Sequence, residues 1–123
     1  MFLLFSHTLT SEQKEDAKGS LGLEEFVTLP SDLQELWSNV PATLDDLSDY
    51  LEPLKHYFQN NLQKHDVVLI QGDFGATYVM VNEVKSLGAK AVHATTKRNV
   101  LEKSIENKIV KTSVFEHVRF RSY

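Results

Sequence analysis

The feature that most constrains this fold is a strand-like segment followed by a glycine-containing turn and a helical pattern. Four consecutive apolar residues, 67–70, form a run typical of a strand buried on both faces of a parallel sheet. Two glycines follow within residues 71–75, and Asp73 is placed to cap a helix. Apolar residues then recur at helical spacing up to Gly88, a residue type that commonly ends helices. The segment therefore predicts a strand, a turn and a helix.

This kind of junction is where open α/β sheets bind phosphate-bearing ligands, because free backbone amides and the helix dipole favour anions. The alternative is that the glycines serve only the turn, and the motif alone does not separate the two. Phe74, within the turn, is a candidate to stack on a nucleic base. The predicted ligand-binding residues here are Gln71, Gly72, Asp73, Phe74, Gly75, Ala76 and Thr77.

Elsewhere the chain alternates strand-like and helix-like segments, which predicts one α/β domain over residues 1–123. We expect a Rossmann-like domain with a mainly parallel central sheet and helices on both faces. The expected strands are 2–6, 25–29, 67–70 and 89–94. Helices are expected over 11–18, with a capping box of Thr10 and Gln13, over 31–40, with Ser31 as cap and Gln34 three residues later, and over 74–87 after the Asp73 cap. An amphipathic segment at 43–62 is expected to be kinked or divided by Pro53.

The last thirty residues differ in pattern, because β-forming residues there alternate with polar ones. Residues 105–110 have a turn-like centre, so we expect a C-terminal β-hairpin or extended tail at the edge of the sheet. On a strand, His117, Arg119 and Arg121 would share one face, opposite Val118 and Phe120. That stripe suits a polyanion, or alternatively protects an edge strand from pairing.

Composition narrows the function classes. The chain is 41% hydrophobic and 24% charged, as in soluble globular proteins, and its lack of cysteine excludes disulfides, iron–sulfur clusters and thiolate zinc sites. The apolar residues 1–5 are too few for a signal peptide or a membrane span, so we expect a cytoplasmic protein with no membrane partner. The formal net charge of −4 argues against binding long nucleic acids.

Charge is unevenly distributed along the chain. Residues 11–53 hold most of the acidic side chains, whereas the chain beyond Gly88 is basic. Acidic proteins that bind anions usually keep a local basic patch of this kind, although it can also be a solvated basic face.

Polar side chains follow three of the expected parallel strands and should converge at one sheet edge. Thr95 and Thr96 offer hydroxyl donors or helix caps, while Lys97 and Arg98 offer positive charge for a phosphate. His7 is a candidate general acid or base, or else a surface histidine in a loop. The full set is Ser6, His7 and Thr8, then residues 72–77, then Thr95, Thr96, Lys97 and Arg98.

Several common enzyme signatures are missing. The chain has no GxxxxGKS/T loop and no GxGxxG motif, and its histidines and carboxylates lack metal-ligand spacing. We therefore expect no metal and no cofactor.

Five motifs in order, spanning residues 2–123, resemble the small stand-alone CRISPR-associated (Csx-type) accessory proteins of type III systems. They are Phe5–Ser6–His7–Thr8–Leu9–Thr10, Leu33–Gln34–Glu35–Leu36–Trp37–Ser38, Ile70–Gln71–Gly72–Asp73–Phe74–Gly75–Ala76–Thr77, Ala94–Thr95–Thr96–Lys97–Arg98, and residues 111–121. The resemblance implies a Rossmann-like relative of the domains that sense cyclic oligoadenylates, several of which are ring nucleases.

A ring nuclease cleaves the cyclic tetra-adenylate second messenger and thereby switches off antiviral signalling. The expected site would then use His7 for proton transfer and Lys97 and Arg98 for charge stabilisation, in a homodimer that matches the two-fold ring. Two alternatives remain open. The protein could sequester the cyclic nucleotide without cleaving it, or act on another phosphorylated metabolite.

Overall fold

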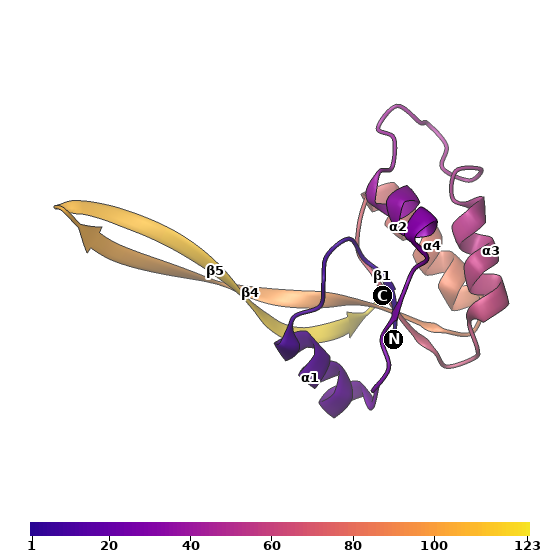
Figure 1. Ribbon diagram of the computed structural model, residues 1–123, viewed down its shortest axis with the longest axis horizontal. Helices are drawn as coiled ribbons and strands as arrows, with labels where there is room; N and C mark the ends of the chain where they lie inside the picture. The colour runs from indigo at the N-terminus through magenta and orange to yellow at the C-terminus, as the bar shows by residue number, and fades with distance from the viewer.

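A five-stranded sheet forms the centre of the computed structural model, which describes residues 1–123 (Figure 1). The strands lie in the order β2-β1-β3-β4-β5. Strands β1 to β4 run parallel to their neighbours, and β5 is antiparallel to β4 at the edge. Their bounds are β1 Phe2–Leu4, β2 Val27–Thr28, β3 Val67–Ile70, β4 Lys90–Ile105 and β5 Lys108–Ser122.

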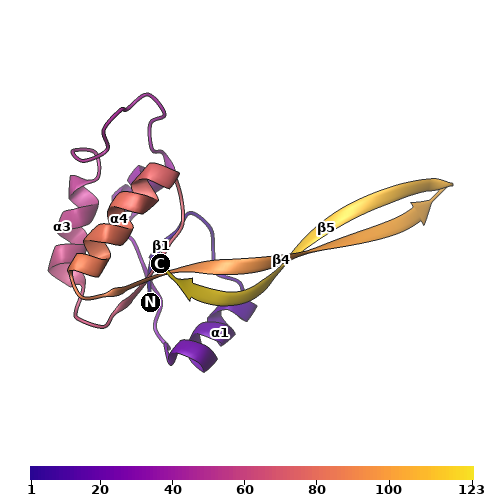
Figure 2. The same ribbon diagram turned by 180° about the vertical axis from the view of Figure 1, so that it is seen from behind.

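Helices cover both faces of the sheet (Figures 1 and 2). Helix α1, Ser11–Leu21, packs on one face through Ala17. Helices α2 (Ser31–Ser38), α3 (Glu52–Asn61) and α4 (Phe74–Ser86) pack on the other face around Trp37 and Phe58. All four residues of β3 are buried, as expected for a central parallel strand between two helical layers. The predicted α/β class and mainly parallel sheet are therefore confirmed.

Local signals at the helix ends are confirmed at several positions. Thr10 and Gln13 form a capping box at the start of α1. Asp73 caps α4 by accepting a hydrogen bond from the backbone N–H of Ala76. Gly88, which follows the C-cap Leu87 of α4, has a φ of 80°, a left-handed conformation that glycine adopts without strain. The strand–turn–helix unit is thus present as predicted.

Two predicted helical features are absent. Residues 43–51 form turns rather than a helix, and α3 begins only at Glu52, with Pro53 in its first turn. The expected Ser31 cap is also wrong, because the N-cap is Pro30. The Gln34 side chain instead donates hydrogen bonds to the Phe5 carbonyl and the Ser38 hydroxyl, and so links α2 to the end of β1.

Strand β4 differs most from its predicted bounds. It does not end near residue 94 but continues to Ile105, far beyond the end of β3. A two-residue turn, Glu106–Asn107 with φ of 50° and 63°, returns the chain into β5. The predicted C-terminal hairpin is confirmed, with β4 as its first strand. Residues 97–116, hereafter the arm, project from the rest of the molecule as a two-stranded ribbon (Figure 1).

A β-bulge at the base of the arm changes which side chains share a face. Thr95 pairs with Arg119 and Thr96 with His117, so Val118 has no partner. His117 consequently lies on the same face as Phe120, with ring centroids 4.9 Å apart. Arg119 and Arg121 lie on the opposite face, so the expected His–Arg–Arg stripe does not form.

His117 also fastens the base of the arm to α1. Its Nε2 lies 2.8 Å from a carboxylate oxygen of Asp16, and its side chain is only 6% exposed. Hydrogen bonds from Ser20 and from His117 to the carboxylate lower the pKa of Asp16 below its ordinary value.

We expect Ser20→Ala and His117→Ala each to raise the pKa of Asp16, because each removes a hydrogen bond to its charged form. Since the folded-state pKa is depressed, ionised Asp16 stabilises the fold above the ordinary value of 3.8. That contribution is lost as the pH falls through the folded-state pKa. An NMR titration of the Asp16 carboxyl carbon measures the shift, with His56→Ala as control. An unchanged pKa in both variants contradicts the assignment.

Candidate functional site

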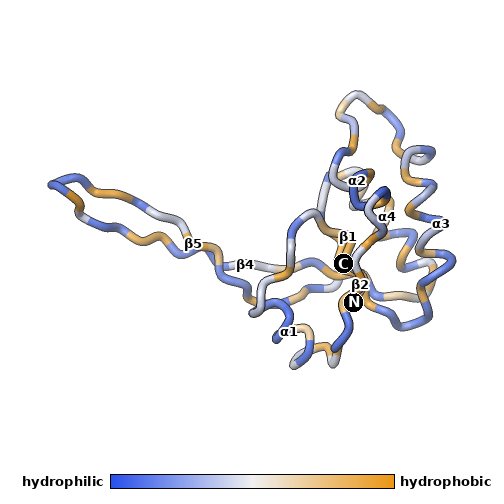
Figure 3. Tube along the Cα trace, viewed as in Figure 1, coloured by the Kyte–Doolittle hydropathy of each residue, from blue (hydrophilic) through white to orange (hydrophobic).

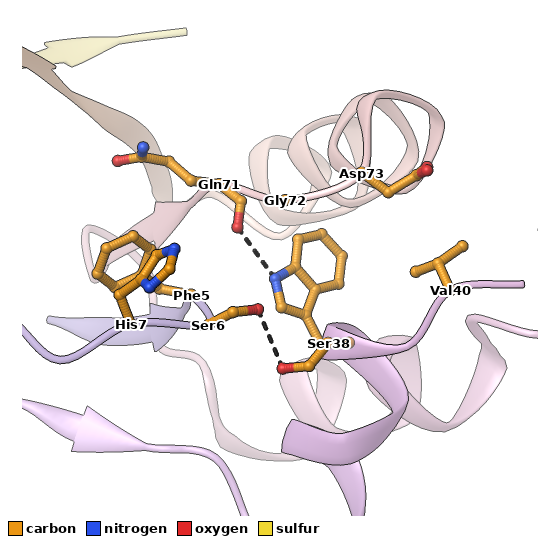
Figure 4. A pocket seen from close by; sticks show the side chains of 9 residues that line it. Phe5, Ser6, His7, Ser38, Val40, Gln71, Gly72 and Asp73 are labelled. Atoms are coloured by element: carbon orange, nitrogen blue, oxygen red, sulfur yellow. Dashed lines mark hydrogen bonds between the residues drawn. The ribbon is translucent and has the colours of Figure 1, made fainter. Parts of the chain in front are cut away.

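A crevice of about 440 Å³ lies at the carboxyl ends of β1 and β3 (Figure 4). The chain leaves β1 toward β2 on one side and leaves β3 toward β4 on the other. In open α/β sheets this reversal of strand order is the usual place for a ligand. The lining residues are Phe5, Ser6, His7, Trp37, Ser38, Val40, Gln71, Gly72 and Asp73.

Trp37 forms the floor of the crevice against the turn after β3. Its indole N–H donates a hydrogen bond of 3.1 Å to the carbonyl oxygen of Gln71 (Figure 4). A Cβ added to Gly72 would lie 2.8 Å from the indole carbon Cε2, closer than side-chain carbons normally approach. Neither Gly72 nor Gly75 has a positive φ. Glycine at position 72 is therefore explained by the close approach of Trp37.

The N-terminus of α4 forms one wall of the crevice. The first N–H groups of a helix have no partner within the helix, and the Asp73 carboxylate accepts only from Ala76, at 3.0 Å. Amides in this first turn remain available to an anion. Ala76 itself is fully buried, so its side chain belongs to the core, as part of the packing beneath the turn.

The segment after β1 forms the facing wall. The Ser6 and Ser38 hydroxyl oxygens are 3.0 Å apart, which joins this segment to the end of α2. The imidazole of His7 is exposed and packs edge-on against Phe5, with ring centroids 5.4 Å apart and no hydrogen bond. Thr8 lies just outside, in an adjoining hollow of about 390 Å³ that it shares with Ser6 and His7.

A second hollow, of about 400 Å³, adjoins the Gln71–Gly72 turn and is lined by Phe74, Thr77, His93 and Tyr123. Phe74 is 95% exposed, while the Thr77 hydroxyl is buried without a hydrogen-bond partner. The rings of His93 and Tyr123 lie 4.7 Å apart.

Sequence reasoning missed several residues that line these hollows, among them Trp37, Ser38, His93 and Tyr123. The position of His93 near the end of the expected strand 89–94 was a usable signal, because that end lies at the ligand-binding edge. The contacts of the other three depend on tertiary packing.

Two side chains hold the end of β3 to its neighbours. The Gln71 side-chain oxygen accepts a hydrogen bond of 2.9 Å from the backbone N–H of Ala94. The Tyr123 hydroxyl donates to the Ile70 carbonyl at 2.6 Å, and burial raises the pKa of this hydroxyl. Gln71 therefore contributes to the frame of the crevice, besides lining it.

The structure does not bring Thr95, Thr96, Lys97 and Arg98 into the crevice. The predicted convergence is wrong because β4 does not end at residue 94, so these residues lie on the strand that leads into the arm. The Thr95 hydroxyl bonds to the Arg119 carbonyl, and the Arg98 guanidinium donates to the Ser113 hydroxyl at 2.9 and 3.1 Å. Thr95 and Thr96 therefore cap no helix.

The charge of the crevice follows from this placement. Asp73 is its only carboxylate, His7 its only titratable base, and no lysine or arginine lines it. No group of three or more histidines and carboxylates could hold a metal ion. None of the helices combines the length and the apolar character needed to cross a bilayer.

Comparison with known proteins shows the family. The sequence model of the Uncharacterized protein MJ1673 family matches residues 1–121, so the chain belongs to that family. The chain is similar to the uncharacterized protein MJ1673 of Methanocaldococcus jannaschii, with 47% identity over 123 residues. The alignment covers 100% of this chain and 95% of the relative. No solved structure matches the chain.

The geometry of the turn distinguishes its two glycines. We expect Gly72→Ala to lower the free energy of unfolding by about 1–3 kcal/mol, because the new methyl group displaces the buried Trp37. Gly75→Ala is the matched control. Its Cβ would lie 3.3 Å from the flexible end of Leu47, so we expect a change below about 1 kcal/mol. Urea denaturation of both variants measures the difference, and equal effects would contradict this explanation of Gly72.

Proposed function

We propose that this protein binds cyclic tetra-adenylate at the carboxyl edge of its sheet and cleaves it to linear products. It would then act as a ring nuclease of type III CRISPR defence, like the Csx-type proteins that its motifs resemble. The observation that carries the proposal is the crevice itself, where His7 and Ser6 line the same hollow as Gly72 and Asp73 at the start of α4. This α/β site is Rossmann-like in its use of a switch point between β1 and β3.

Phosphate recognition would come from the first turn of α4. Its free amides and the positive end of the helix dipole attract a phosphate, although the Asp73 carboxylate opposes part of that attraction. The hydroxyls of Ser6, Ser38 and Thr8 are further donors around the crevice.

Base recognition would come from Phe74. A phenyl ring that is 95% exposed at the mouth of a polar site is available to stack on an adenine. Stacking of a base on an aromatic side chain contributes about 1–3 kcal/mol. The second hollow, which Phe74 shares with Thr77, would receive that base.

Cleavage would use a hydroxyl of the ligand itself. A ribose 2′-oxygen attacks the adjacent phosphorus, the bond from phosphorus to the 5′-oxygen breaks, and a 2′,3′-cyclic phosphate forms. His7 is the candidate to take the proton from the 2′-hydroxyl, and the departing 5′-oxygen gains a proton to become a hydroxyl. Alignment and charge stabilisation of the phosphate supply the remaining catalysis.

The ligand's size favours a homodimer. A crevice of about 440 Å³ is at the lower end of small-molecule sites and cannot enclose a ring of four nucleotides. Two copies related by a two-fold axis would present the same residues to each half of a two-fold ring. No lysine or arginine lines the crevice of one copy, so a second copy is also the proposed source of positive charge.

Sequestration without cleavage is the second candidate. It is favoured by the environment of His7, which is exposed and has no hydrogen bond to fix the orientation of its ring. A general base is usually oriented by a third group.

Incubation of the protein with labelled cyclic tetra-adenylate in excess EDTA tests the reaction. We expect linear products that end in a 2′,3′-cyclic phosphate, identified by mass spectrometry, because the 2′-hydroxyl route needs no metal. Activity that is lost in EDTA and restored by a divalent ion would contradict this mechanism. Intact ring recovered with bound protein would favour sequestration.

His7→Ala separates binding from catalysis. We expect this variant to lose about 10²–10⁴-fold in cleavage rate while ligand-induced stabilisation is retained, because proton transfer is lost and most contacts remain. A hundredfold excess of ligand over Kd raises stability by about 2.7 kcal/mol, which thermal unfolding detects. His56→Ala, an exposed histidine on α3, is the control. Equal rates in both variants would exclude His7 from proton transfer.

A further inference from the structure

The arm exposes an unusual amount of apolar surface for a region with no packing partner. Seven of its twenty residues are large hydrophobic side chains that are exposed by 43% to 70%. None of the 22 buried residues of the protein lies in the arm. The alternation of polar and apolar residues along the ribbon is visible in Figure 3. The exposed residues are Val100, Leu101, Ile105, Ile109, Val110, Val114 and Phe115.

One face of the arm carries an uninterrupted apolar stripe. Cross-strand register places one apolar side chain in each of four successive pairs on this face, alternately from β4 and β5. The pairs are Ile105 with Lys108, Lys103 with Val110, Leu101 with Thr112, and Asn99 with Val114. Lys97, Lys103 and Lys108 lie on the same face, where Glu116 is the one carboxylate, so this face is both apolar and mainly basic.

The opposite face is interrupted by polar contacts. Glu102 and Lys111 form an ion pair of 3.7 Å across the ribbon. Closer to the base, the Arg98 guanidinium bonds to the Ser113 hydroxyl. The two faces therefore differ in the continuity of their apolar surface.

An isolated two-stranded ribbon is at best marginally stable in water, because it has no third strand and no helix to cover its apolar side chains. We propose that the striped face of the arm docks on a second copy of this chain, so that two copies clasp each other's bodies with their arms. The inference rests on the proposed homodimer but is independent of the proposed ligand.

The body of the protein has a complementary surface at the carboxyl edge of the sheet. Leu44, in the loop before α3, is 43% exposed, and Tyr78 on α4 is 73% exposed. Leu47 of the same loop lies beside the Gly75 backbone at the start of α4, which places loop and helix side by side. The loop and its end carry the carboxylates Asp45, Asp46, Asp49 and Glu52. This apolar and acidic surface matches a stripe bordered by lysines.

The distribution of net charge also favours contact between the arm of one copy and the body of the other. The arm holds five basic and three acidic residues, a net charge of +2, whereas the rest of the chain holds eight basic and fourteen acidic residues, a net charge of −6. Attraction between unlike charges favours arm-to-body contact over arm-to-arm contact and over body-to-body contact.

The available area is sufficient for a stable dimer. Nine residue pairs make a ribbon about 30 Å long, and two strands are about 10 Å across. One face of each arm then covers about 300 Å². With two arms and the two surfaces that they cover, about 1,200 Å² would be buried, at the lower end of the range of stable interfaces.

Nucleic acid is a less suitable occupant. A basic ribbon resembles the β-ribbons that enter DNA grooves, but such grooves offer little apolar surface to a stripe of four aliphatic side chains. The acidic body would also be repelled by phosphates.

Sedimentation of the ligand-free protein over a range of concentrations tests the proposal with a matched pair of variants. Leu101 and Val100 are neighbours on β4, are 50% and 52% exposed, and point to opposite faces. We expect wild type to be a dimer. Leu101→Glu should raise the dimer Kd on the order of a hundredfold, because it places a carboxylate in the stripe. Val100→Glu should change it less than about threefold, with both variants retaining the wild-type far-UV circular dichroism.

Tyr78→Glu tests the acceptor surface and should also raise the dimer Kd at least about tenfold. The proposal is overturned if the wild-type protein is a monomer. It is also overturned if Leu101→Glu and Val100→Glu raise the dimer Kd equally. Loss of the dimer in Leu101→Glu but not in Tyr78→Glu would show that arms meet each other. Binding of a 30-bp DNA duplex by a monomeric wild type, lost in Leu101→Glu, would assign the arm to nucleic acid. A dimer that fails to cleave cyclic tetra-adenylate would leave this inference standing and overturn only the proposed reaction.

Discussion

The contact between Trp37 and the turn after β3 fixes the geometry of the carboxyl edge. Trp37 is 2% exposed, so its indole N–H needs a partner within the protein, and the Gln71 carbonyl supplies it. The ring can reach that carbonyl only because position 72 has no Cβ. This one interaction sets the distance between α2 and the start of α4, and with it the width of the crevice. Ser38, the residue after Trp37, is thereby brought to Ser6.

The crevice and most of the basic side chains lie on separate surfaces of the molecule, whereas a protein that binds an anionic ligand usually combines the two. The crevice offers amides, hydroxyls and one imidazole, while most basic side chains of the C-terminal region lie along β4 and β5. The physical cause is the continuation of β4 past its parallel neighbour, which carries Lys97 and Arg98 away from the strand ends. In the proposed dimer, the arm of one copy would approach the carboxyl edge of the other. The basic side chains of one copy would then lie close to the crevice of its partner.

Much of the body was predictable because its signals are local. The buried strand 67–70, the Asp73 cap, the capping box at Thr10 and the glycine after α4 each depend on a few neighbouring residues. The segment 43–51 was predicted wrongly because its leucines recur at helical spacing. The Asp46 side chain instead accepts a hydrogen bond from the backbone N–H of Ser48, a local contact that competes with helix formation, and Leu47 packs against the start of α4 from this loop.

The α/β class, the strand–turn–helix unit and the hairpin turn near residue 106 follow from the amino-acid sequence alone, since periodicity, caps and turn residues act over short distances. The sequence also places Ser6, His7 and residues 71–73 at one edge, because parallel strands end together. The end of β4 depends on tertiary contacts, since a strand continues for as long as a neighbour supplies hydrogen bonds, and β5 supplies them as far as Ile105. The bulge at Val118 is equally non-local, and it alone determines that His117 meets Asp16 while Arg119 and Arg121 face the other way.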